Sequence, residues 1–356
     1  MDMRRLDKDT CVMRAASLLS LFSCLTVASR VEPGKRLIKT EFEVLELNDD
    51  EVQDLIVRNA PFMDISYGPE LQKSDSLPKA KLPTKLREHR ASTIRTLIDD
   101  IDKELMKKHS NKLASSRSKA TTGREPTEWL FRMIRHLTKN SPMRVTTQRI
   151  IHKGRPQFSI SCRIESPDKN MSLDKMDRVI LSAPINGGAS VVAQLEVLRL
   201  VASTAVQITR PIEFLFFSAE KAGLLGSQSV IRHYQKKNIS AAVLHTDIDS
   251  HTASGAEAAI GLIRDNTDRR MNRLLQILIG SYSTLPVRNI KCGYACSDYY
   301  SWHVAGYPVA GLSSGTMTKR RSHTLAKTVN FDYVKEFVNI ALSYALHMTD
   351  PEVNYN

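Results

Sequence analysis

The chain has 356 residues, of which 42% are hydrophobic, and its formal net charge is +13. This hydrophobic fraction is ordinary for a globular protein, and it argues against a disordered chain and against a membrane protein. The 51 Lys and Arg residues are spread widely, with dense patches only at KAKLPTKLREHR and TKRRSH, and no nucleic-acid-binding motif is present, so we expect no nucleic-acid partner.

Residues 1–28 have the pattern of a secretory signal peptide. A basic start precedes the apolar run AASLLSLFSCLTVA, and Thr26 and Ala28 supply small residues before a cleavage point at Ser29. The apolar run is too short to span a bilayer as a helix, which needs about 20 apolar residues. A buried N-terminal helix is the alternative, because acidic residues interrupt the basic start. The pattern predicts a secreted, extracellular protein without a membrane span.

Residues 29–80 form a polar stretch of mixed charge with several prolines, which is typical of a propeptide or an N-terminal arm. The hydrophobic pattern changes near Lys81. Beyond it, IRTLIDDIDKEL and PTEWLFRMIRHL have apolar residues at helical spacing. We therefore divide the chain into a signal peptide (1–28), a propeptide-like segment (29–80) and one large domain (81–356).

Strand and helix patterns alternate over the rest of the chain. RVILSA, IEFLFFS, AAVLHTDI and YPVAGL predict strands, and long amphipathic stretches between and after them predict helices, the last being FDYVKEFVNIALSYALHM. Such alternation predicts an α/β fold with a mostly parallel sheet covered on both faces. Sites in these sheets lie at the carboxyl ends of strands, where the sequence places Glu220, Asp247 and Asp249.

Cysteines and sequons fit an exported chain. Cys292 and Cys296 flank GYA at a spacing that a short disulfide loop can close in an oxidising compartment. A metal-binding pair is the alternative, although no second Cys or His pair follows at zinc-finger spacing. Cys162 has no partner and is expected to be a small buried side chain. Asn170 and Asn238 lie in Asn-x-Ser sequons and predict glycosylation.

Four stretches together resemble the secreted di-zinc leucine aminopeptidases of fungi and bacteria: FFSAEKAGLLGS, VLHTDID, CGYACSDYYSWHVAGYP, and SHT before a long C-terminal helix. The resemblance runs from about Lys35 to the C-terminus. It implies a three-layer α/β/α sandwich around a mixed sheet, a propeptide, and peptide or protein N-termini as substrates. It also implies two zinc ions that share a bridging aspartate, with a metal-bound hydroxide that attacks the peptide carbonyl.

The resemblance assigns roles to individual residues. Glu220 matches the general base, and Tyr294 matches the phenol that stabilises the tetrahedral intermediate. Asp247 and His323 match ligands that complete the two zinc sites. The base is followed in the family by a second glutamate, which binds zinc, but Lys221 stands at that position here.

Two further ligands of the family are missing from this sequence. The family follows its strand with Gly-Ala-His and then Pro-Gly-Ala-Asp-Asp, whereas VILSAPINGGASVVAQ passes from strand to helix almost directly. Lys327 occupies another position that is acidic in the family. The two missing ligands and Lys221 together leave three of the five metal-ligand positions missing or replaced. Catalytic zinc normally has three protein ligands, so the two positions that remain are too few for two ions. We expect zinc to be weakly bound or absent.

Three functions compete on this evidence. We favour a secreted leucine-aminopeptidase-like protein with little or no peptidase activity, in which the ammonium of Lys221 offsets the charges of Asp247 and Glu220. The second is a metal-dependent aminopeptidase that releases N-terminal residues such as leucine, with Glu220 as base and one residual or relocated metal. His245, Asp247 and Asp249 share one strand face and would serve such a metal. The third is a basic extracellular binding module that uses TKRRSH.

Overall fold

The computed structural model describes residues 32–74, 77–78, 80–83, 85–118, 123–152, 155–165, 177–248, 258–314 and 329–349. Several predictions fall outside these ranges: the signal peptide at residues 1–28, the sequon at Asn170, the TKRRSH patch, and the residues Asp249, His323 and Lys327. None of the helices inside these ranges combines the length and the apolar character that crossing a bilayer requires.

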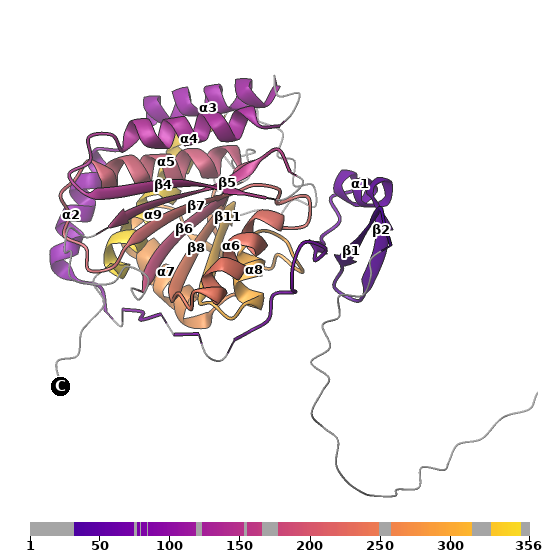
Figure 1. The fold of residues 1–356 in the computed structure, drawn as a ribbon. Helices are drawn as coiled ribbons and strands as arrows, with labels where there is room; N and C mark the ends of the chain where they lie inside the picture. Colours follow the sequence, from indigo (N-terminus) through magenta and orange to yellow (C-terminus); the bar gives the residue numbers. More distant parts are fainter. Residues whose placement is uncertain are drawn as a thin grey trace, which may run out of the picture.

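A mixed sheet of eight strands lies at the centre of the fold (Figure 1). The four strands β11, β8, β6 and β7 are neighbours and run parallel. Beyond β7 the sheet continues with β5 and then β4, and beyond β11 it continues with β9 and then β10. The pairs β7–β5, β5–β4 and β11–β9 are antiparallel. In the order of the sheet the strands are β10 (Val287–Ile290), β9 (Ile260–Ile263), β11 (Val309–Ser314), β8 (Ala241–Asp247), β6 (Arg178–Pro184), β7 (Ile212–Phe217), β5 (Phe158–Glu165) and β4 (Arg144–Ile151).

Helices cover both faces of the sheet. One face carries α2 (Glu88–Asp99), α3 (Lys103–Ser118), α4 (Glu125–Leu137), α5 (Gly188–Ala202), α7 (Arg269–Tyr282) and α9 (Phe331–Met348); the other carries α6 (Leu225–Lys236) and α8 (Tyr299–Val304). Side chains alternate along each strand between two cores, so that Val179 and Leu181 face the first while Ile180 faces the second. The predicted three-layer α/β/α fold is confirmed.

The connection from β6 to α5 is short and buried. Pro184 ends the strand, and the helix begins at Gly188. The hydroxyl of Ser190 accepts a hydrogen bond of 2.7 Å from the backbone N–H of Ile248, which ties the first turn of α5 to the end of β8. Every residue of α5 except Arg199 is buried. The direct passage from strand to helix therefore forms part of the hydrophobic core.

Residues 32–64 form a small unit beside the domain, which we call the N-terminal unit (Figure 1). Its sheet has β1 (Lys35–Lys39) between β2 (Val44–Asn48) and β3 (Met63–Asp64), all antiparallel. Helix α1 (Asp49–Val57) completes the unit, and Ile38, Val52 and Phe62 form its core. The side chains of Asn48 and Glu51 cap the start of α1 reciprocally, which fixes where the helix begins.

Residues 65–74, 77–78 and 80–83, which we call the strap, lie along the outside of the domain between the N-terminal unit and α2 (Figure 1). Leu71 is buried, and the backbone carbonyl of Pro69 accepts a hydrogen bond of 2.8 Å from Arg232. At the far end, the N–H of Lys81 donates to a carboxylate oxygen of Asp177 over 2.8 Å. The predicted boundary at residue 80 falls within this strap, and a propeptide role for residues 29–80 stays a prediction.

Candidate functional site

Two of the predicted site residues lie at the carboxyl ends of the central strands β7 and β8. We call this end of the parallel strands the site edge. Asp247 is the last residue of β8, and Glu220 lies three residues after the end of β7. The exposed fractions of Glu220 and Asp247 are 6% and 4%. Ala219, just before Glu220, has a positive φ of 56°, so the chain turns sharply where it leaves the strand.

Ser297 connects Glu220 to the interior through hydrogen bonds. Its hydroxyl donates to Oε1 of Glu220 over 3.1 Å and lies 3.0 Å from Nε2 of His245. Nδ1 of the same histidine lies 3.0 Å from the hydroxyl of Ser182. Because the single hydroxyl hydrogen of Ser297 goes to Glu220, Nε2 of His245 is the donor to Ser297, and Nδ1 accepts from Ser182. This chain of buried groups fixes the orientation of Glu220.

A third carboxyl group lies in the same region. Asp298, directly before α8, is fully buried. Burial raises the pKa of Asp298 well above its usual range, and the nearby charges of Glu220 and Asp247 raise it further. Ser297 and Asp298 are not among the predicted site residues, although both directly follow CGYAC in the motif that carries the resemblance.

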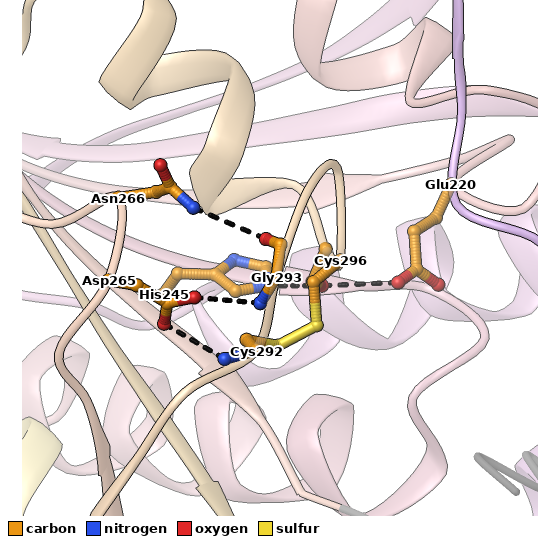
Figure 2. The surroundings of a disulfide bond; sticks show 8 residues. Glu220, His245, Asp265, Asn266, Cys292, Gly293 and Cys296 are labelled. Carbon is orange, nitrogen blue, oxygen red and sulfur yellow. Dashed lines mark hydrogen bonds between the residues drawn. A yellow bond between two sulfur atoms is a disulfide. The ribbon is translucent and has the colours of Figure 1, made fainter. Parts of the chain in front are cut away.

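A disulfide joins Cys292 to Cys296 (Figure 2). The carboxylate of Asp265 accepts hydrogen bonds from the backbone N–H groups of Cys292 (2.8 Å) and Gly293 (2.7 Å), so the loop has a second constraint. Figure 2 shows the carboxyl group of Glu220 beside this loop. The bonded sulfurs favour the disulfide over the metal pair. Cys162 is free and buried, as predicted, and burial raises the pKa of its thiol to about 12.

Lys221 stands where the resemblance expects a zinc ligand. Its Nζ donates a hydrogen bond of 2.8 Å to the side-chain oxygen of Asn59, in the N-terminal unit. Tyr294 also contacts this unit, because its hydroxyl donates to the backbone carbonyl of Lys39 over 3.1 Å. Burial raises the pKa of Tyr294, and the ring packs against Tyr300 with centroids 5.0 Å apart. Both residues therefore bind a segment that lies far from them in the sequence.

The predicted glycosylation site Asn238 is exposed and lies just after the end of α6. Its φ of 52° is one that asparagine tolerates better than most residues. The side chain thus has room for a glycan, and glycosylation stays a prediction.

The fold and the site edge define an α/β protein of the zinc exopeptidase class, and comparison with known proteins agrees. Residues 185–341 match the model of Peptidase family M28. A probable aminopeptidase of Saccharomyces cerevisiae is 30% identical over 326 residues, which cover 83% of this chain and 86% of that protein. A probable leucine aminopeptidase of Arthroderma otae is 25% identical over 361 residues, covering 92% and 96%. The chain belongs to peptidase family M28, and the predicted family is confirmed.

A solved structure shows the same fold. The crystal structure of the Legionella pneumophila LapA aminopeptidase superimposes with a TM-score of 0.74 at 20% sequence identity. The match covers 91% of this chain and 96% of that chain, so it includes residues well outside the region matched by the family model.

Membership of this family implies zinc, which the residues of the site edge can be tested against. Catalytic zinc takes three protein ligands, drawn from histidine and carboxylate side chains, together with a water. Within the described ranges, no group of three or more His, Cys, Asp or Glu side chains has an arrangement that could hold a metal ion. An ammonium at position 221 would also repel a dication. The described donors at the site edge therefore do not fit a two-zinc centre.

Proposed function

We propose that this member of family M28 is a secreted aminopeptidase-like protein with little or no peptidase activity. The observation that carries the proposal is Lys221, whose ammonium donates to Asn59 at the position of a zinc-binding glutamate. The pattern of residues 1–28 supports secretion. The ligands that the family implies for the site edge are the N-termini of peptides or proteins.

The donor chemistry supports weak metal binding. Losing one outer partner of a zinc ligand already lowers metal affinity about 10- to 100-fold, and here ligand positions themselves are missing or replaced. The short β6–α5 connection carries Ile185, Asn186 and Gly187, where the family has a histidine and a bridging aspartate. Of these three residues, only Asn186 has a side chain with a hydrogen-bonding group.

A second function has an observation in its favour. Glu220 and Asp247 are buried at the carboxyl ends of β7 and β8, the two strands that flank β6, and Ser297 holds Glu220 by a hydrogen bond. This arrangement supports a metal-dependent aminopeptidase with Glu220 as general base, releasing N-terminal residues such as leucine. Asp247 and His323 are the two ligand positions of the family that remain in the sequence, and a residual or relocated zinc ion would use one of them.

Zinc content and peptide hydrolysis separate the two functions. The purified chain would be dialysed against trace zinc, analysed for bound metal, and assayed for release of leucine from a leucine anilide. A Lys221→Glu variant would be treated in parallel. We expect less than about one-tenth of a zinc ion per wild-type chain and no hydrolysis above that of a Glu220→Gln variant.

The opposite result has a clear form. One or more tightly held zinc ions per chain, with hydrolysis that Glu220→Gln abolishes, would replace the proposal by the metal-dependent aminopeptidase. Metal binding by Lys221→Glu alone would support the proposal, because it would identify the ammonium as the group that excludes zinc.

A further inference from the structure

Contacts between the N-terminal unit and the site edge converge on the turn after β7. The backbone N–H of Asp64 donates to the carbonyl of Gly223 over 3.0 Å. The carbonyl of Asp64 accepts a hydrogen bond of 3.1 Å from the side chain of Gln228, at the start of α6. Both backbone polar groups of Asp64 are thus hydrogen-bonded. One bonds to the turn that carries Glu220 and Lys221, and the other bonds to the first turn of α6.

Gly223 makes this close approach possible. A Cβ atom there would lie 2.4 Å from the backbone nitrogen of Asp64 and 2.8 Å from the ring of Phe62. The φ of Gly223 is also positive, at 95°, which disfavours any other residue. The glycine that punctuates SAEKAGLLGS therefore has a specific role, which is to admit β3.

Lys221 complements the end of helix α1. Asn59 follows the helix in the left-handed conformation, with φ of 52°, and backbone N–H groups of residues 59 and 60 bond back to the last turn. The carbonyl end of a helix carries partial negative charge, and the basic residue of α1 at this end is Arg58 at the C-cap, which pairs with Asp54. The ammonium of Lys221 supplies a second cation there and a hydrogen bond to Asn59. A glutamate at position 221 would place a negative charge at the same end.

Tyr294 provides a second point of attachment. Its hydroxyl donates to the carbonyl of Lys39, the last residue of β1, and the side chain of Lys39 forms an ion pair with Glu70 of the strap. Attachment at Lys221 and at Tyr294 engages two different elements of the N-terminal unit, the end of α1 and the end of β1. Two attachment points restrict the unit more strongly than one.

We infer that the site edge is a binding surface for the chain's own N-terminal unit, and that Lys221 and Tyr294 are the residues that bind it. The lysine that stands in place of a metal ligand is a latch for a protein segment. This inference rests on the placement of the unit, and it holds whether or not a metal binds elsewhere at the site edge.

Amide hydrogen exchange of the full-length protein tests the latch, with all samples first treated with a chelator. The reporter is the amide of Asp64, which bonds to Gly223 across the interface. The reference is the amide of Ile65, the first residue of the strap, which bonds to Leu37 of the N-terminal unit and not to the domain. Lys221→Met should raise the exchange rate of Asp64 about threefold, since the hydrogen bond that is lost joins a charged group to an exposed acceptor and is weakened by solvent. The rate of Ile65 should rise less.

Asn59→Gly removes the acceptor side chain and keeps the left-handed backbone, so it is the matched partner variant. Because both changes remove the same hydrogen bond, the double variant should exchange no faster than the faster single variant. Tyr294→Phe should raise the Asp64 rate independently, so its effect should multiply with that of Lys221→Met. Lys108→Met, which changes an exposed lysine of α3, should leave both rates unchanged.

Three outcomes would overturn the inference. In the first, the Asp64 rate does not respond to Lys221→Met. In the second, the Asp64 and Ile65 rates rise by the same factor, which would mean that the lysine stabilises the unit itself. In the third, the effects of Lys221→Met and Asn59→Gly multiply. Zinc content measured on untreated samples is a separate readout, so failure of the proposed inactivity and failure of the latch are distinguishable.

Discussion

The hydroxyl of Ser297 donates a hydrogen bond to the carboxylate of Glu220, and both residues are buried. Replacing Ser297 by alanine would leave a buried carboxylate oxygen and a ring nitrogen of His245 without this partner. We expect Ser297→Ala to lower the free energy of unfolding by about 1–3 kcal/mol. Urea unfolding would measure it. Ser281→Ala, on the exposed side of α7, should change the same quantity by less than about 0.5 kcal/mol. Equal effects would contradict the role given to Ser297.

A buried ion pair between Arg178 and Glu213 gives a larger expected effect. Their charged atoms lie 2.7 Å apart, and Tyr234 and Ser161 each donate a further hydrogen bond of 2.6 Å to the carboxylate. Arg178→Met would leave this carboxylate buried without its cation, at a cost of about 3–5 kcal/mol in stability. Adding Glu213→Leu should recover part of that loss, because the unpaired charge is removed while the hydroxyls of Tyr234 and Ser161 lose their acceptor. Urea titrations of the single and double variants test this, and an additive double loss would count against it.

The stability of the protein should fall in mild acid because of His152. Burial lowers the pKa of His152 to about 4, and the backbone N–H of Ser159 donates to its Nε2, which therefore carries no proton. An unfolded histidine has a pKa near 6.5, so below that pH the unfolded chain binds a proton that the folded chain does not. The stabilisation is complete above about pH 6.5 and is lost as the pH falls toward 4.

This histidine alone should remove about 2 kcal/mol between pH 7 and pH 5. The measurement is the free energy of unfolding at both pH values for the wild type and for His152→Gln. We expect the difference between the two pH values to shrink by about that amount in the variant. If the stability of His152→Gln had the same pH dependence as that of the wild type, folding would not lower the pKa of His152, and the prediction would be wrong.

The Cys292–Cys296 disulfide closes a short loop, so its stabilising effect should be modest. The chain-entropy estimate for a loop this short is about 2 kcal/mol. The double variant Cys292→Ser with Cys296→Ser should lose that much stability and should become insensitive to reductant. The hydrogen bonds from the loop to Asp265 remain available, so we expect the variant to fold. A wild type whose stability does not change on reduction would contradict this prediction.

The sequence predicted the middle of the fold better than its edges. The strands β6, β7, β8 and β11 are long apolar runs that are buried on both faces, and this composition is visible in the sequence. Strand β4 is an edge strand of mixed polarity, and its pattern does not distinguish it from a loop. The spacing of IRTLIDDIDKEL predicts one helical stretch, but the chain leaves the helix between α2 and α3, where the N–H of Asp102 bonds to Glu196 of α5.

The site was predictable where a motif carried it. Glu220 and Asp247 were placed correctly at strand ends, because the ends of apolar runs can be read from the sequence. The partner of Lys221 could not be read in this way. Its ammonium donates a hydrogen bond to Asn59, which is 162 residues earlier in the chain, and no local pattern connects the two. The sequence suggested an electrostatic role for Lys221 beside Asp247 and Glu220, and that role stays a prediction.

The strap has a consequence for any protease that reaches it. Leu71 is buried against the domain, and backbone carbonyls of residues 69 and 72 accept hydrogen bonds from Arg232 and Gln235 of α6. A single peptide-bond cut at residues 72–74 would leave contacts on both sides of the break. The two fragments would separate on a denaturing gel and would elute together from a sizing column, so proteolytic maturation and physical release of the N-terminal unit would be two different events.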